Sequence, residues 1–187
     1  MAGIAHVTLE AGPYALRPAT VADAEAALAM SRDRAILQWN STWVVDLESA
    51  ARWCLRGSDW SSGLHATLAI VDAQDQYIGN FSIGGIDLEN QRCASVGYRV
   101  APWRRNRGVA SHALAAATQW GFQSLGLERL DLPHAVENPA SCRVAEKCGF
   151  LFEGLLRKGF RDDYGQRWDS HLHGRLATDT GPFLLAP

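Results

Sequence analysis

Residues 95–111, with the sequence SVGYRVAPWRRNRGVAS, constrain the fold more than any other part of the chain. They begin as a β-strand, pass through Ala-Pro into a short basic turn, and then open a helix. The first N–H groups of a helix have no partner inside it, and the aligned peptide dipoles leave a partial positive charge there. Because Gly108 and Ala110 keep side chains away from these N–H groups, the turn predicts a site that a phosphate can approach closely.

Positive charge surrounds this turn, since Arg104, Arg105 and Arg107 lie within it. The turn has neither the Lys-Ser/Thr of a P-loop nor the G-x-G-x-x-G of a dinucleotide fold. We therefore expect a pyrophosphate held by backbone N–H groups, and we call residues 105–110 the phosphate turn. A solvated, arginine-rich surface turn is the alternative interpretation of the same residues.

The motif R-x-x-G-x-A of the phosphate turn, after a strand that ends in G-Y-R-V-A-P, resembles the coenzyme A signature of GNAT-superfamily N-acetyltransferases. The resemblance extends over residues 14–176, through L-R-P-A-T at 16–20, N-P-A-S at 138–141 and A-E-K-C-G-F at 145–150. It is strongest to the Rim-type subgroup, which includes enzymes that acetylate the N-termini of ribosomal proteins.

The resemblance implies an α/β fold of the α+β kind, in which helices flank a mixed, mostly antiparallel sheet of about seven strands. The sheet would be splayed between the fourth and fifth strands, so that coenzyme A fits in the gap. The sequence patterns predict strands at 14–18, 66–72, 77–86, 93–100, 129–136, 150–157 and 167–176. They predict helices after Thr20 and at 46–57, 108–125 and 141–148.

Length and composition predict one domain over residues 1–187, with its core at about 14–176 and a loose tail after Ala177. A net charge of −2 argues against nucleic acid or an anionic membrane as a partner. We see no signal peptide and no apolar run long enough to span a bilayer. The four cysteines lack C-x-x-C spacing, which predicts free thiols and a cytoplasmic location.

The resemblance also implies which residues bind acetyl-coenzyme A. Backbone N–H groups of the phosphate turn would bind the pyrophosphate, and the Ser111 hydroxyl would assist. Backbone groups of residues 98–100 would pair with the pantetheine arm as an added strand, and an amide near Val100 would polarise the thioester carbonyl. The expected coenzyme-binding residues are Tyr98, Arg99, Val100, Arg105, Asn106, Arg107, Gly108, Val109, Ala110, Ser111, Asn138 and Ser141.

Ser141 is the candidate general acid. Asn138 and Ser141 lie where the fifth expected strand turns into a short helix, so a turn and a helix cap are their structural interpretation. The departing coenzyme A thiolate needs a proton, and a hydroxyl at this helix start could supply it. Many GNAT enzymes carry a tyrosine seven residues after the asparagine, but Ala145 occupies that position here. Rim-type resemblance therefore implies that the serine takes this role.

The general base has several candidates. Related sequences often have a glutamate where this chain has Ser95, which cannot serve. His134 is the replacement we favour, because imidazole can remove a proton near neutral pH. A buried core histidine beside Leu130 and Leu132 is the competing interpretation. Asp87 and Glu89 are further candidates that would act through water.

His171 and His173 lie two apart on an expected strand and share a face, which is also the spacing of a metal pair. No third ligand accompanies them at a typical spacing, so we expect a structural role and no metal. Cys93 and Cys142 lie near the expected site, but no His–Cys pair is evident. Direct transfer without an acyl-enzyme is therefore expected.

Aromatic residues point to the acceptor side. Four tryptophans fall around the two N-terminal helices, where GNAT folds form the acceptor site, and one or two of them are candidates to line it: Trp39, Trp43, Trp53 and Trp60. Trp103 precedes the phosphate turn and is a candidate shield for the coenzyme. The loop at residues 161–165 is a candidate rim of the acceptor cleft, with a solvated turn as the alternative.

The expected function is transfer of an acetyl group from acetyl-coenzyme A to a primary amine, with a protein N-terminal α-amine as the leading acceptor. A small-molecule amine (an antibiotic, a polyamine or an amino-acid derivative) and an acyl group larger than acetyl stay open. So do a non-catalytic acyl-coenzyme A sensor, favoured by Ser95 and Ala145, and a plain partner-binding domain. The seven tryptophans are compatible with a homodimer.

Overall fold

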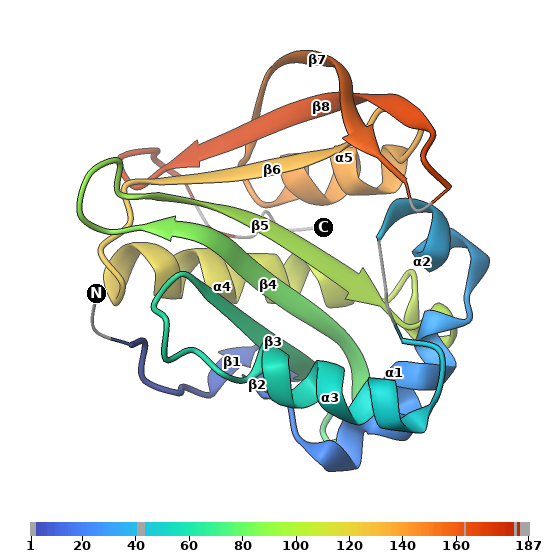
Figure 1. The fold of residues 1–187 in the computed structure, drawn as a ribbon. Helices are drawn as coiled ribbons and strands as arrows, with labels where there is room; N and C mark the ends of the chain where they lie inside the picture. The colour runs from blue at the N-terminus through green and yellow to red at the C-terminus, as the bar shows by residue number, and fades with distance from the viewer. Residues whose placement is uncertain (1–2, 41–43, 163, 182, 184–187) are drawn as a thin grey trace.

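A computed structural model describes residues 3–40, 44–162, 164–181 and 183 of the chain. Its eight described strands form one sheet in the order β1-β2-β3-β4-β5-β6-β8-β7 (Figure 1). The strands are β1 Leu9–Ala11, β2 Tyr14–Pro18, β3 His65–Val71, β4 Tyr77–Asp87, β5 Cys93–Val100, β6 Arg129–Ala135, β7 Leu151–Arg161 and β8 Arg167–Leu176. The helices are α1 Ala24–Ser31, α2 Arg34–Trp39, α3 Leu47–Gly57, α4 Val109–Gln123 and α5 Pro139–Lys147, with 3-10 turns η1 Val21–Asp23 and η2 Pro102–Arg104.

The sheet is antiparallel at every junction except the one between β5 and β6. That parallel ladder runs only from the pair Cys93–Arg129 to the pair Ser95–Asp131, although both strands continue. β5 and β6 meet at one end and diverge toward α2 (Figure 1). The predicted sheet, splayed between the fourth and fifth expected strands, is therefore confirmed.

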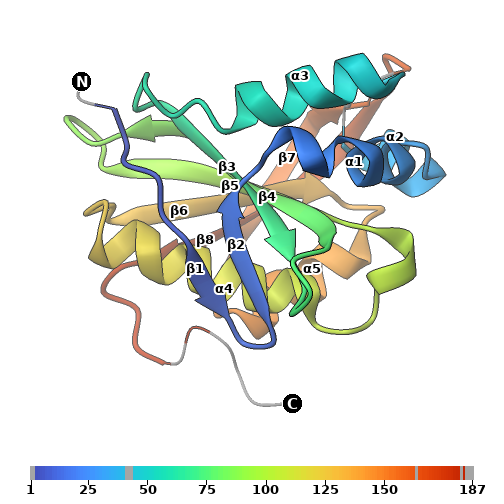
Figure 2. The ribbon, with the colours of Figure 1, turned by 90° about the horizontal axis from the view of Figure 1, so that it is seen from below.

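Helices cover both faces of the sheet. α1 and α3 lie on one face, and α4 and α5 lie on the other (Figure 2). β3 shows how the sequence produces two layers, because alternate side chains point to opposite faces of a strand. Leu68 and Ile70 join the core beneath α4, whereas Ala69 and Val71 join the smaller core beneath α1 and α3.

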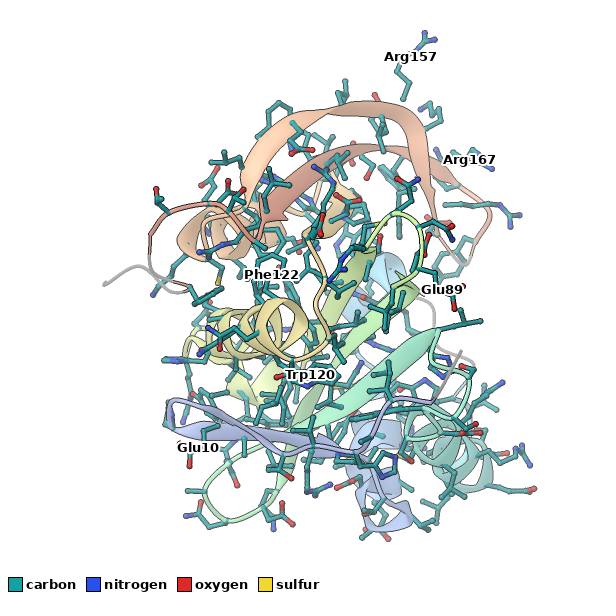
Figure 3. All side chains as sticks on the ribbon, turned by 90° about the vertical axis from the view of Figure 1, so that its left-hand side faces the viewer. Glu10, Glu89, Trp120, Phe122, Arg157 and Arg167 are labelled. Carbon is teal, nitrogen blue, oxygen red and sulfur yellow. The ribbon has the colours of Figure 1, made fainter. Side chains whose placement is uncertain are left out.

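α4 packs closely on the sheet because its inner side chains are small. Ala113 and Ala117 are fully buried, and Trp120 packs against Trp60 with ring centroids 6.0 Å apart. Figure 3 shows α4 nearly end-on with Trp120 and Phe122 labelled, and it shows Arg157 of β7 projecting away from the sheet. No helix of the described residues combines the length and the apolar character needed to cross a membrane.

Three features differ from the sequence predictions. An eighth strand, β1, precedes the expected first strand, and the short helix α2 was not predicted. The tail after Ala177 was expected to be loose, yet Ala177 N donates to Glu128 O at 2.9 Å. Phe183 also packs under the Arg175 guanidinium, 4.6 Å from the ring centroid. An apolar ring and a backbone hydrogen bond thus hold the described part of the tail.

Candidate active site

The divergence of β5 and β6 opens a cleft of about 490 Å³, which we call the β5–β6 cleft. The starts of α4 and α5 and one side of α2 also line it. His134 and every predicted coenzyme-binding residue except Arg107 contribute to its walls, namely Tyr98, Arg99, Val100, Arg105, Asn106, Gly108, Val109, Ala110, Ser111, Asn138 and Ser141. The fold therefore brings segments from three distant parts of the chain to one place.

The phosphate turn leads directly into α4. Asn106 and Gly108 both have left-handed backbones, with φ of 60° and 74°, and Gly108 is the N-cap of α4. Val109, the residue after Gly108, begins the helix, so the N–H groups of its first turn follow directly from this turn. Ser111 is buried in the first turn of the helix, at 5% exposure. The predicted phosphate site therefore lies at the N-terminus of a helix of 15 residues.

Two of the three arginines of this region are held by carboxylates. Arg104 Nη2 lies 2.5 Å from Asp72 Oδ2. Arg105 Nη2 lies 2.5 Å from Asp33 Oδ1, and Asp33 also caps α2 through the N–H of Ile36. These two arginines therefore position the phosphate turn as well as adding charge to it, which the sequence alone did not predict.

The pair between Arg105 and Asp33 also fixes the charge state of the carboxyl. Burial by itself raises the pKa of Asp33, but the hydrogen bonds from Arg105 and from the N–H of Ile36 outweigh that effect. The pKa of Asp33 is therefore below its usual value, and the carboxylate stays ionised at neutral pH. The Arg107 side chain is exposed, and its carbonyl oxygen accepts from Tyr14 Oη at 2.9 Å.

Among the described residues, β6 pairs with only the first half of β5. On its other edge β5 pairs with β4 as far as Val100–Gly79. Among the described residues, the ladder with β6 ends at Ser95. A strand edge without a partner presents backbone donors and acceptors to any extended ligand. The pairing of residues 98–100 with the pantetheine arm stays a prediction.

Asn138 and Ser141 are in contact at the start of α5. Asn138 caps the helix, and its Nδ2 donates to Ser141 Oγ at 3.1 Å. Ser141 is only 9% exposed and lines the β5–β6 cleft. Because Ser141 Oγ accepts this bond, its own hydrogen stays available to another acceptor.

The Tyr98 side chain is a site feature that the sequence analysis missed, since only its backbone was predicted to matter. Its hydroxyl is buried, with no hydrogen bond of good geometry among the described residues. Burial raises the pKa of Tyr98, and the neighbouring Ser141 hydroxyl offsets only part of that rise. The phenol therefore stays protonated beside Ser141. Ala145, by contrast, is fully buried in the main core.

His134 is 7% exposed on β6 and lines the β5–β6 cleft. Its Nδ1 lies 2.8 Å from the carbonyl oxygen of Ala135, so Nδ1 carries the hydrogen and Nε2 carries the lone pair. Nε2 is buried and has no hydrogen-bond partner in the described part of the chain. Burial is the largest cause that lowers the pKa of His134, and the nearby His173 and His171 lower it further.

The other candidate bases lie outside the cleft. Ser95 is exposed, and the Asp87 carboxylate accepts from the N–H groups of the turn that follows it, at 2.8 Å from Asn90 N. Glu89 borders a second, larger hollow of about 880 Å³ between the N-terminal segment and α4, as does Glu10 (Figure 3). The described lining of that hollow contains no lysine or arginine, so it does not suit a pyrophosphate. The hypothesis that Asp87 or Glu89 is the base receives no support.

Aromatic residues close one end of the β5–β6 cleft. Trp39 of α2 and Phe160 of β7 both line it, and Trp39 contacts Phe160 and Trp168 with centroids 6.2 and 5.5 Å apart. Trp168 Nε1 donates to the buried Asp162 at 2.8 Å, which holds the Trp168 ring against this wall. Among the described tryptophans of the predicted group, Trp39 lines the cleft.

The remaining tryptophans have other positions. Trp60 is a core residue, and Trp53 lies under the Arg99 guanidinium, 4.9 Å from its ring centroid. Trp103 is 49% exposed and does not line the cleft. Trp43 and Asp163 lie outside the described residues.

The expectation that no His–Cys pair exists is wrong. Cys142 Sγ lies 3.2 Å from His171 Nδ1 and 3.6 Å from His173 Nε2. His134 joins them, so two further ligand-type side chains accompany the predicted pair. Sequence spacing missed this group because its members come from β6, α5 and β8.

The chain is similar to known acetyltransferases. The family model described as "Acetyltransferase (GNAT) domain" matches residues 14–151. The ribosomal-protein-serine acetyltransferase of Escherichia coli is 31% identical over 114 residues, which are 60% of this chain and 62% of that protein. The spermidine N(1)-acetyltransferase of Vibrio cholerae is 33% identical over 91 residues, 49% of this chain and 52% of that protein. The chain spans about half the length of most curated relatives it matches.

Similarity to a solved structure extends further. Mycobacterium smegmatis RimJ in complex with CoA-disulfide has a TM-score of 0.81 and 26% sequence identity to this chain. The match covers 92% of this chain and 87% of that one.

Proposed function

The chain belongs to the GNAT acetyltransferase family, and from this premise we propose that it moves an acetyl group from acetyl-coenzyme A directly to a primary amine. One observation carries the proposal: a single cleft joins the phosphate turn, the second half of β5 and the Asn138–Ser141 pair. A donor bound along this line would have its pyrophosphate at the start of α4 and its thioester near α5. Rim-type relatives support the same assignment.

Binding of acetyl-coenzyme A would use mainly backbone groups. The N–H groups of the phosphate turn would donate hydrogen bonds to the pyrophosphate oxygens, and residues 98–100 would pair with the pantetheine arm. Five basic side chains line the cleft and complement the charge of the phosphates: Arg99, Arg104, Arg105, Arg143 and Lys147. A nearby backbone N–H at the end of β5 would polarise the thioester carbonyl.

The reaction would need a neutral amine and an acid for the leaving thiolate. We propose His134 as the group that accepts the amine proton, because it is a neutral imidazole in the cleft wall. Ser141 would donate its hydrogen to the coenzyme A sulfur, while the Asn138 amide holds its oxygen in place. The amine proton taken by His134 would pass to solvent, and Ser141 would regain a proton from solvent as coenzyme A leaves, with the protonated Tyr98 hydroxyl beside it.

We propose a protein N-terminal α-amine as the acceptor. An α-amino group, with a pKa of about 7.8, loses its proton more easily than a lysine at about 10.4. No aspartate or glutamate belongs to the described cleft lining, so a polyamine would lack carboxylates to bind its charges. Trp39 and Phe160 instead offer an apolar contact for a peptide side chain.

Thiol release from acetyl-coenzyme A tests the proposal. The acceptors are a Ser- or Ala-started peptide, the same peptide with a blocked N-terminus and one lysine, spermidine, and an aminoglycoside. Release with the free N-terminal peptide alone supports the assignment. Release with spermidine or the aminoglycoside would identify a small-molecule amine as the acceptor instead. Tight coenzyme binding without release from any amine would favour a sensor, and no binding would refute the acetyl-coenzyme A site.

The compartment and the oligomeric state are further proposals. Free thiols at all four cysteines support the reducing cytoplasm. Exposed apolar side chains on the edge strand β7 support a homodimer, namely Leu151, Phe152, Leu155 and Leu156. Sedimentation velocity measures the oligomeric state directly.

A further inference from the structure

Four ligand-type side chains from three elements meet under α5. His134 of β6 and His171 of β8 are direct partners in the antiparallel ladder, and His173 lies two residues further along β8. Cys142 reaches them from α5. One potential ligand atom from each residue lies within 4.8 Å of all the others. We call these four residues the His–Cys cluster.

The spacing of the cluster is close to that of a tetrahedral zinc site. With Zn–S near 2.3 Å and Zn–N near 2.0–2.1 Å, tetrahedral geometry separates ligand atoms by about 3.3–3.6 Å. The distance from Cys142 Sγ to His173 Nε2, 3.6 Å, already fits, and the distance to His171 Nδ1, 3.2 Å, would lengthen by about 0.3 Å. Two ligand atoms that lie 4.8 Å apart, the upper limit for any pair in the cluster, would have to approach each other by about 1.3 Å to bind one zinc ion. Small side-chain rotations supply a shift of this size.

The hydrogen bond of His134 leaves one of its ring nitrogens with a lone pair available. His134 uses Nδ1 to donate to the Ala135 carbonyl, and this arrangement commonly orients a metal-ligating histidine. Its Nε2 is buried without a partner among the described residues, at a residue exposure of 7%. A buried acceptor without a partner is costly. A bound cation would satisfy it.

We propose that His134 Nε2, Cys142 Sγ, His171 Nδ1 and His173 Nε2 bind one Zn²⁺. Three imidazoles and one thiolate are donors that zinc prefers, whereas Mg²⁺ and Ca²⁺ prefer oxygen. Binding breaks the S–H bond of Cys142, so one proton is released to solvent for each zinc bound. No electron transfer is involved.

Zinc binding has a consequence for the β5–β6 cleft. His134 lines the cleft, and Ser141 is the chain neighbour of Cys142. Zinc on His134 Nε2 would occupy the lone pair that the proposed base uses. On the proposed function, the zinc-loaded protein therefore loses amine-dependent transfer while it keeps coenzyme binding. The metal site itself does not depend on that function.

Cobalt titration of the full-length, chelator-stripped and reduced protein tests the site. We expect one Co²⁺ per chain, with visible bands of tetrahedral intensity and a near-ultraviolet thiolate-to-cobalt band, all abolished by one equivalent of Zn²⁺. Cys142→Ser should lose the thiolate band, and His171→Gln should weaken binding by at least about 10-fold. Cys93→Ser is the matched control, because Cys93 lies outside the cluster and should leave the spectrum unchanged.

Three results would overturn the metal site: no tetrahedral bands in the wild type, a thiolate band that persists in Cys142→Ser, or loss of the bands in Cys93→Ser. Circular dichroism of each variant shows whether it is folded, and His171→Gln provides the second ligand test if Cys142→Ser does not fold. Acetyl-coenzyme A thermal shift on the same samples separates the two proposals. A normal shift without cobalt bands would refute the metal site and leave the proposed function intact.

Discussion

Substitution of Gly108 tests the phosphate turn most directly. Gly108 has φ of 74°, and a Cβ added there would lie 3.3 Å from His112 Cδ2. A non-glycine residue in the left-handed region costs about 1–2 kcal/mol, which corresponds to about 2–8 °C in Tm for a chain of this size. Gly108→Ala and Gly108→Glu share this backbone cost. Only the glutamate adds a negative charge beside the proposed pyrophosphate.

The difference in acetyl-coenzyme A affinity between the two variants measures the effect of the added negative charge. Two unit charges about 4 Å apart near a protein surface repel by about 4 kcal/mol, and solvent screening reduces this to about 2–3 kcal/mol. We therefore expect Gly108→Glu to bind acetyl-coenzyme A about 30- to 150-fold more weakly than Gly108→Ala. Calorimetric titration measures the affinities, and differential scanning measures both Tm values. Affinities within about threefold of each other, at equal Tm, would refute the assignment of the phosphate turn.

Three other substitutions test separate parts of the structure. Ser141→Ala should keep coenzyme affinity and lower kcat by about 100-fold, and unchanged turnover would remove Ser141 from the mechanism. Trp39→Ala should raise KM for the peptide by about 10-fold with little change in acetyl-coenzyme A affinity. An unchanged KM would show that Trp39 does not contact the acceptor peptide. Asp23, buried and paired with Arg17 at 2.9 Å, has a pKa lowered despite its burial by the bonds from Arg17 and Thr20. Above pH 4, Asp23→Asn should lower the free energy of unfolding by about 2–3 kcal/mol relative to the wild type, and this difference should shrink as the pH falls through the lowered pKa of Asp23. A difference that stays constant with pH in denaturant titrations would contradict this.

Local patterns predicted most of the fold and most of the residues that line the β5–β6 cleft. The strand, turn and helix around Gly108 lie within 17 consecutive residues, so the chemistry of the turn is visible in the sequence. The Asn138–Ser141 contact spans three residues and was visible for the same reason. β1 and α2 were missed because they are only three and six residues long, too short for a clear periodic pattern.

The His–Cys cluster marks the limit of sequence reasoning here. His134, Cys142 and His173 come together only because β6 pairs with β8 and α5 packs over both strands. No local spacing encodes that packing. The pairing of Arg104 and Arg105 with carboxylates likewise depends on contacts across 32 and 72 residues.

The short ladder between β5 and β6 makes the sheet two subassemblies, β1 to β5 and β6 to β8, joined by backbone pairing at three positions. A pantetheine arm paired with β5 would occupy the missing part of that seam. Substrate binding would then be cooperative with folding, and amide hydrogens near the seam would exchange more slowly as donor is added. In a cell, the resistance of this protein to proteolysis would follow the supply of acetyl-coenzyme A, which links its abundance to the metabolic state.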